Sequence, residues 1–426
     1  MFESIANFGR RHRRGFFITA GIIGSFYALG QYAKRKIVEL QEKATRDNVA
    51  KENLRRRFEQ NQRDCLMTVL SLLPTLGEQM ISEVNVEGSI ARLQQKRTTR
   101  TPPEATESID EDQAKPVVSE EVMDRKTKLE LWEELKITSF TQTIASIYLT
   151  VLLNIFVHIQ LNLLGRFIYI DSVLSFSEKD REKSFRLEPT TDERRRLSRE
   201  VERKFLTFSW WLLHVGWKRC VDNVKVAVEE VLGETSLKKT FNLHDVVNTI
   251  QEIRTRVEFE GNTSDLSDNR TPTNMRDLLL PDDLEGELQV LKEGSGMEDP
   301  QMDNELRMLL DEVKDFLDSP DFVVVRQSCL DEAFSFLSYN LRTTFLSKGT
   351  PVRPTPKLYE LDSPEDPTVD QASERAIPLV SLLPVISRQV HQIINGVPNE
   401  YVEILCSVKE LQSYSAIVYS SFNLED

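Results

Sequence analysis

The spacing of apolar residues predicts a protein built from helices. Apolar positions that include Phe58, Leu66, Val69 and Leu73 recur three and four residues apart, which is the helical period. Pro74 is expected to kink or break this helix. Further helices are predicted at Arg194–Leu232, Leu243–Glu258, Asn304–Leu317, Phe322–Leu346, Ile377–Ile394 and Val402–Phe422. Repeated turn-rich strand signals are missing from the sequence, so we predict an all-α fold with one elongated helical bundle.

An uncharged run at 15–33 lies between two basic clusters. It follows a short basic segment at 1–14 and is closed by KRK at 34–36. A helix of this length spans about 28 Å, close to the roughly 30 Å of membrane hydrocarbon. A cleaved signal peptide, a mitochondrial presequence and a core helix fit this long, uncharged, doubly flanked run less well. We therefore predict a transmembrane anchor. Its apolar side chains are Phe16, Phe17, Ile18, Ile22, Ile23, Phe26, Tyr27 and Leu29.

The uncharged stretch Ile137–Gly165 is a second candidate for a membrane span. Its polar residues recur every four positions and form one seam: Gln142, Ser146, Thr150, Asn154, His158 and Asn162. The opposite face is aliphatic: Ile144, Ile147, Val151, Ile155 and Ile159. Polar groups are costly in lipid unless they face a partner, so a helix buried in the core of a bundle fits better. We interpret His158 as a hydrogen-bonded core residue, and a second span remains the alternative.

Charge is distributed unevenly along the chain. Residues 1–63 hold 14 Lys/Arg and 6 Asp/Glu, a net +8, which leaves −22 for the remainder of a chain whose total is −14. A basic head beside an acidic body suits an anionic membrane surface and disfavours nucleic acid. Arg55, Arg56 and Arg57, on a predicted polar helix Lys34–Asp64, are either a solvated face or a lipid contact. Both flanks of the anchor are basic, so charge alone does not orient it.

Three stretches, 98–124, 261–303 and 347–372, are rich in Pro, Ser, Thr, Asp and Glu and poor in large apolar residues. Such segments cannot bury enough apolar surface to offset the entropy of ordering. We predict them to be disordered insertions in one cytosolic helical domain at 34–426. The alternative reading makes them domain boundaries, but the helices between them are too few to form separate cores.

Known catalytic and metal-binding patterns are absent from the sequence. Cys65, Cys220, Cys329 and Cys406 lie far apart without CxxC spacing, which indicates reduced, buried thiols. HExxH, GxxxxGK[ST], GxGxxG and GxSxG do not occur, and the five histidines include no nearby pair at ligand spacing. We predict no enzyme activity, no metal site and no cofactor.

Several long blocks resemble the peroxin-3 family, whose members are peroxisomal biogenesis factor 3. The blocks occur in family order along nearly the whole chain: FEQNQRDCLMTVLSLLPTL at 58–76, KLELWEELKITSFT at 128–141, QLNLLGRFIYID at 160–171, LDSPDF at 317–322 and PLVSLLPVISRQVH at 378–391. The stretches 98–124 and 261–303 are where this chain is longer than compact members.

The resemblance implies a single-pass protein of the peroxisomal membrane, reached directly or via the endoplasmic reticulum, with its bundle in the cytosol. It implies docking of the amphipathic N-terminal helix of peroxisomal biogenesis factor 19, the cytosolic chaperone and receptor for new peroxisomal membrane proteins. It also implies contact with peroxisomal membrane lipids and supports the buried reading of Ile137–Gly165. Adaptors for organelle inheritance or pexophagy on the acidic loops stay an open question. A two-span structural component, or an organelle tether, is the alternative function.

The resemblance also assigns residues to the docking surface. Trp132 matches the family's docking tryptophan, and Lys128 takes the basic position one helical turn before it. Leu129 lies near the same face, while Leu131 and Leu135 are expected to turn toward the bundle. A tryptophan at the edge of the core is the alternative interpretation. The remaining matched positions are Leu93, Pro378 and Leu379, with Ser381 where some members carry a lysine.

Overall fold

The computed structural model confirms the all-α fold for the residues that it describes, among which strands are limited to four two-residue pieces. The described residues are 49, 51–83, 88, 117–182, 197–260, 271–345 and 375–421, with side chains in the long helix described for 129–170. The chain divides into two compact units, Met1–Gln60 and Asn61–Asp426. The predicted anchor at 15–33 and the predicted insertion at 347–372 lie outside the described residues, as do positions 98–116.

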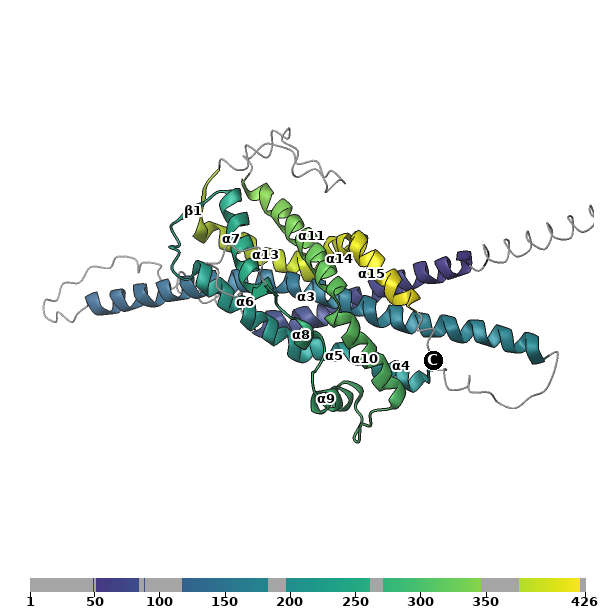
Figure 1. Cartoon of the computed structure of the whole chain (residues 1–426). Helices are drawn as coiled ribbons and strands as arrows, with labels where there is room; N and C mark the ends of the chain where they lie inside the picture. The colour runs from purple at the N-terminus through teal and green to yellow at the C-terminus, as the bar shows by residue number, and fades with distance from the viewer. Residues whose placement is uncertain are drawn as a thin grey trace, which may run out of the picture. The chain divides into compact units, whose positions relative to one another are not determined.

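The second unit is built mainly from helices (Figure 1). Its helices are α3 (Val117–Glu182), α4 (Arg199–Leu206), α5 (Ser209–Trp211), the π-helix η2 (Leu212–Gly216), α6 (Trp217–Leu232), α7 (Leu243–Glu258), α8 (Arg276–Leu279), α9 (Leu284–Ser295), α10 (Asn304–Asp318), α11 (Pro320–Phe345), α13 (Leu379–Asn395), α14 (Glu400–Ser407) and α15 (Lys409–Ser420). The strands form two antiparallel pairs, β1 (Thr240–Phe241) with β4 (Ile377–Pro378) and β2 (Phe259–Glu260) with β3 (Thr271–Pro272). A further helix, Lys51–Glu83, begins in the first unit and continues into the second.

Helix α3 is the central helix of the second unit, with α6, α11, α13 and α15 packed around it (Figure 1). Two described helices are long and apolar enough to cross a membrane by length and composition, Lys51–Glu83 and Leu129–Ile170. In the most apolar window of Leu129–Ile170, 94% of the residues are buried inside the protein, against 33% for Lys51–Glu83. The predicted core position of Ile137–Gly165 is therefore confirmed, because neighbouring helices occupy the space that lipid would need.

The polar seam of α3 is buried. Ser146 and Thr150 donate to carbonyl oxygens of α3 itself, whereas His158 and Asn162 reach other helices. His158 Nδ1 lies 3.0 Å from Ser415 Oγ on α15, which confirms its reading as a hydrogen-bonded core histidine. Asn162 Oδ1 accepts from Asn61 Nδ2 and Gln62 Nε2, each at 2.9 Å, so the seam also binds the part of the helix Lys51–Glu83 that belongs to the second unit. Buried polar groups are tolerated when they are satisfied in this way.

Acid is expected to destabilise the fold through His158. Burial lowers its pKa to about 4 from the usual 6.5, so between these values the unfolded chain binds a proton that the folded chain does not. Stability contributed by the neutral imidazole is complete above pH 6.5 and is lost as pH falls toward 4. Between about pH 7 and about pH 4.5, we expect the free energy of unfolding of wild type to fall by roughly 2.5 kcal/mol more than that of His158→Gln. Urea unfolding at both pH values measures this, and an unchanged loss in the variant would contradict it.

The C-terminal part of the helix Lys51–Glu83 covers the core with one face. Its inward side chains recur three and four residues apart and are fully buried: Cys65, Val69, Leu73, Leu76 and Met80. Of the two effects predicted for Pro74, a break is contradicted, because the helix continues through this residue; a kink stays a prediction. Contacts made by the residues around Pro74 hold the helix in place; Gln79 Oε1, for example, accepts from Trp217 Nε1 at 3.1 Å.

The predicted disorder at 261–303 was wrong for residues 271–303. This part forms β3, α8 and α9, and most of its large apolar side chains are buried: Met275, Leu278, Leu279, Leu280, Val290 and Leu291. The charge of the buried Glu287 is compensated, because its carboxylate binds Arg307 and Lys314. The end of the predicted insertion 98–124 is also helical, because α3 begins at Val117. Composition averaged over a stretch conceals a few well-placed leucines and ion pairs.

Two predicted helices are each interrupted. Arg194–Leu232 is divided into α4, α5, η2 and α6, and the π-helical segment ends at Gly216. A Cβ at Gly216 would stand 1.9 Å from the Leu278 carbonyl oxygen, so the backbone of α8 is packed directly against this turn. Val402–Phe422 is divided at Val408, whose backbone is extended between α14 and α15. By contrast, α7 has the predicted bounds Leu243–Glu258, since Asn242 and Asp245 cap each other's backbone amides at its start.

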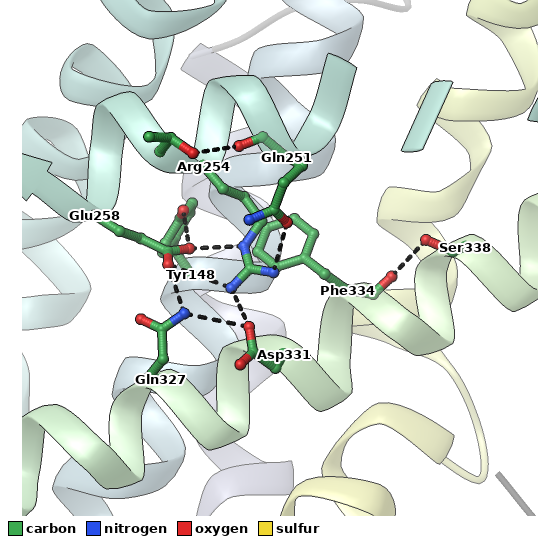
Figure 2. A network of polar contacts seen from close by, with 9 residues as sticks. Tyr148, Gln251, Arg254, Glu258, Gln327, Asp331, Phe334 and Ser338 are labelled. Atoms are coloured by element: carbon green, nitrogen blue, oxygen red, sulfur yellow. Dashed lines mark hydrogen bonds and ion pairs between the residues drawn. The ribbon is translucent and has the colours of Figure 1, made fainter. Parts of the chain in front are cut away.

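A buried ionic network joins α3, α7 and α11 (Figure 2). Arg254 Nε donates to Glu258 Oε1 at 2.7 Å, and Tyr148 Oη donates to the same carboxylate at 2.8 Å. From α11, Asp331 accepts from Arg254 at 2.6 Å and Gln327 donates to Glu258 at 2.9 Å. Burial raises the pKa of Tyr148, which keeps its hydroxyl protonated. The network fixes three helices at one place with every carboxylate oxygen of Glu258 hydrogen-bonded.

Candidate functional site

Trp132 lies on a turn of α3 whose two sides have different surroundings. Leu135 is buried and Leu131 packs against the core, as predicted for the inward side of this turn. Trp132 is partly exposed and also touches the core, and Leu129, three residues earlier, has 58% of its surface exposed. Residues three apart in a helix are neighbours. Leu129 and Trp132 therefore present an apolar pair to solvent, and the Trp132 ring is not sealed inside the fold.

The turn that carries Trp132 is anchored by a buried lysine. Lys136, one turn further along α3, is 1% exposed. Its ammonium donates to the carbonyl oxygens of Thr235 at 2.8 Å and Gly233 at 3.2 Å, and pairs with Glu133. These carbonyls follow the C-terminal end of α6, where a cation is favourable. No sequence pattern distinguishes this role, because Lys136 is one of several charged residues beside Trp132.

The same loop after α6 connects the Trp132 turn to the start of α13. The carbonyl of Leu237 accepts from the amide of Val380 at 3.2 Å, and the carbonyl of Lys239 accepts from the amide of Leu379 at 2.9 Å. β1 and β4 continue this pairing, with Thr240 opposite Pro378. Two regions nearly 250 residues apart in sequence, around 132 and around 378, are thus held by one loop. We call Leu129, Trp132 and Pro378 the candidate docking surface.

The predicted site residues differ in how exposed they are in the structure. Pro378 is exposed at the end of β4, and Ser381 is exposed on α13. Leu379 is 0% exposed, so its side chain belongs to the core at the start of α13, and a part for it in docking stays a prediction. Leu93 and the side chain of Lys128 lie outside the described residues.

The chemistry available to these residues is binding. Among the described residues, no group of three or more His, Cys, Asp or Glu side chains could hold a metal ion. The four cysteines are free thiols, three of them buried, and burial raises the pKa of Cys220 and of Cys406 to about 12. Such thiols stay protonated at neutral pH and are poor nucleophiles. An exposed indole beside an exposed leucine instead resembles the aromatic and aliphatic anchors of protein interfaces.

Arg55, Arg56 and Arg57 are exposed at the start of the helix Lys51–Glu83. Arg55 pairs with Glu59 at 2.8 Å and Arg56 pairs with Glu52 at 3.1 Å, both within the helix. Exposed pairs of this kind are weak and leave the cations available to solvent or to another anion. Lipid contact by Arg55, Arg56 and Arg57 stays a prediction.

Comparison with known proteins places the chain in a family. The family model of Peroxin-3 matches residues 7–120 and 102–421. The chain belongs to the peroxin-3 family. It is 29% identical to Peroxisomal biogenesis factor 3 of Homo sapiens over 423 residues, which cover 99% of this chain and 98% of that protein.

Fungal relatives in the peroxin-3 family show similar identity. Peroxisomal biogenesis factor 3 of Yarrowia lipolytica is 30% identical over 445 residues, covering 98% of this chain and 99% of that protein. Peroxisomal membrane protein PEX3 of Komagataella phaffii is 31% identical over 287 residues, 61% of this chain and 60% of that protein. The resemblance seen in the sequence blocks is confirmed, and this member of the peroxin-3 family is a peroxisome biogenesis factor.

Proposed function

We propose that this protein is a membrane-anchored docking receptor for peroxisomal biogenesis factor 19. The amphipathic N-terminal helix of that chaperone places its apolar side chains on the candidate docking surface, and its cargo of new membrane proteins is thereby delivered to the peroxisome. The N-terminal run 15–33 is the single membrane anchor, and the helical bundle faces the cytosol.

The observation that supports this proposal is the uncovered apolar pair on α3. Leu129 and Trp132 are neighbours on one helical face, and both reach solvent. The nearby Leu131 and Leu135 pack in the core. The pair stands on a rigid base, because Lys136 and the loop after α6 fix the turn beneath it. A preorganised apolar face is what an amphipathic helix from a partner recognises.

The first test is direct binding of factor 19 to the full-length chain, with Leu129→Ser as the variant. Leu129 is mostly exposed, so its replacement should leave the free energy of unfolding nearly unchanged. We expect the affinity for factor 19 to fall by about tenfold, measured by fluorescence anisotropy. Val226→Ser is the matched control, since Val226 on α6 is 56% exposed and not part of the surface. Equal binding by wild type and Leu129→Ser would count against docking here.

A protein with two membrane spans is the alternative, with Leu129–Ile170 as the second. Burial of this helix disfavours a second span, because 94% of the residues in its most apolar window are buried inside the protein. Expression of residues 40–426 without detergent provides the test. We expect a monodisperse helical protein by size-exclusion chromatography and circular dichroism. Aggregation that only detergent reverses would favour the second span.

A further inference from the structure

A second uncovered surface follows α4 and α5, apart from the residues around Trp132. Five side chains recur four, three, four and three residues apart and line one open pocket of about 610 Å³; the last of them, in η2, is buried: Arg199, Arg203, Leu206, Trp210 and Leu213. The right-handed helical backbone of Thr207 and Phe208 carries the helical path from α4 into α5, so this spacing keeps the five on one face. We call these five residues the arginine–tryptophan stripe.

On the far wall of the pocket, the backbone of α9 packs closely against Thr207 and Trp210. Gly294 of α9 lies so near that a Cβ added there would stand 2.5 Å from Thr207 Cγ2 and 3.1 Å from Trp210 Cγ. The Trp210 ring is stacked on His214 at 4.5 Å between centroids, which fixes its orientation. Trp210 is only partly buried and Leu206 is 39% exposed. The apolar end of the stripe is therefore rigid and reaches solvent.

The polar end of the stripe carries two arginines that have no partner among the described residues. Neither Arg199 nor Arg203 forms an ion pair or side-chain hydrogen bond with any residue that the structure describes, and both are exposed. Their neighbour Lys204, in contrast, is buried and bound to Glu200 and Asp303. Glu202 also lines the pocket, between the two arginines. The pocket is therefore lined by two positive charges, one negative charge and an apolar half.

We propose that the arginine–tryptophan stripe docks an amphipathic helix of a partner protein that carries two acidic residues one turn apart. The acidic residues pair with Arg199 and Arg203, a basic residue between them faces Glu202, and apolar residues on the same face cover Leu206 and Trp210. The stripe runs over three to four helical turns, about 21 Å, which matches a short helix laid along it. This partner is distinct from the one proposed for the Trp132 surface, and neither proposal depends on the other.

A partner helix is favoured over a membrane surface by charge. Glu202 in the pocket repels a purely anionic ligand, whereas a peptide can present a cation to it. The chain outside residues 1–63 carries −22, because the total is −14 and residues 1–63 carry +8. Such a body is repelled by an anionic bilayer except where a strong basic cluster overcomes the repulsion. Two arginines with a glutamate between them form no such cluster.

Charge reversal with rescue tests the proposal. The full-length chain is held in nanodiscs of neutral phosphatidylcholine, and the probe is a fluorescein-labelled helical peptide with two glutamates one turn apart, a lysine between them, and leucine and phenylalanine following on the same face. The variant is Arg199→Glu with Arg203→Glu. The control is Lys218→Glu with Lys225→Glu, which changes the net charge equally at exposed positions of α6.

We expect wild type and control to bind the probe equally, and the Arg199/Arg203 variant to bind it about tenfold more weakly. A second probe with the two glutamates changed to lysine should bind the variant better than wild type. Trp132→Ala should leave both results unchanged, which separates this surface from the proposed docking of factor 19. Equal binding of the first probe by wild type and variant would overturn the proposal. So would flotation with phosphatidylserine vesicles that requires Arg199 and Arg203 while the peptide fails to bind.

Discussion

Replacing Trp132 by alanine is expected to weaken binding of factor 19 by about 30- to 1000-fold, which corresponds to roughly 2–4 kcal/mol. The indole is partly exposed on a turn fixed by Lys136, so it can cover apolar side chains of a partner without rearrangement. Truncating a tryptophan at the centre of an interface costs this much binding free energy, because the pocket on the partner is left unfilled. Titration of labelled factor 19 against the full-length chain measures the change.

Trp210→Ala is the matched control for Trp132→Ala. Trp210 is also partly exposed and packed against the core, but it lies in the pocket beside α9. It should retain full binding of factor 19. Both variants should keep the helical circular dichroism signal, since each ring has only part of its surface in the core. If Trp132→Ala instead lowered the melting temperature strongly and lost binding only through unfolding, the tryptophan at the edge of the core would be the right interpretation.

Replacing Glu258 by alanine is expected to lower the free energy of unfolding by about 3–5 kcal/mol. The carboxylate is 2% exposed and binds Arg254, Tyr148 and Gln327 from three different helices (Figure 2). Its removal leaves the Arg254 guanidinium buried with Asp331 as a partner, and the Asp331 side chain is 57% exposed. A buried cation that has lost its main counter-ion is among the most destabilising defects. Denaturant unfolding at neutral pH measures the loss.

Two comparisons separate the buried pair from a general effect of charge. Glu252→Ala removes a carboxylate from the same helix, but that carboxylate is 57% exposed and pairs with Arg256 at the surface. Its cost should be at most about 1 kcal/mol. Arg254→Met with Glu258→Met should cost less than Glu258→Ala alone, because no charge is left buried. A cost for Glu258→Ala within 1 kcal/mol of that for Glu252→Ala would contradict this account.

The amino-acid sequence by itself predicted the helical class, the core position of Ile137–Gly165 and the bounds of α7. These features depend on local or periodic information. A polar residue at every fourth position of α3 indicates a seam that must be satisfied by other helices, as His158 and Ser415 show. The Asn242–Asp245 capping box begins a helix wherever the rest of the chain lies. Leu131 and Leu135 could be assigned to the core for the same reason.

Only the tertiary structure decided which residues around the docking surface reach solvent. Leu129 and Leu379 are both leucines in blocks that match the family, yet one is exposed and the other is fully buried. The fold of 271–303 and the anchoring of Lys136 likewise depend on residues distant in sequence, such as Arg307, Lys314 and Thr235. Spacing along the chain fixes the face on which a side chain lies. Whether that face is covered depends on the helix that packs against it, and no local pattern carries that information.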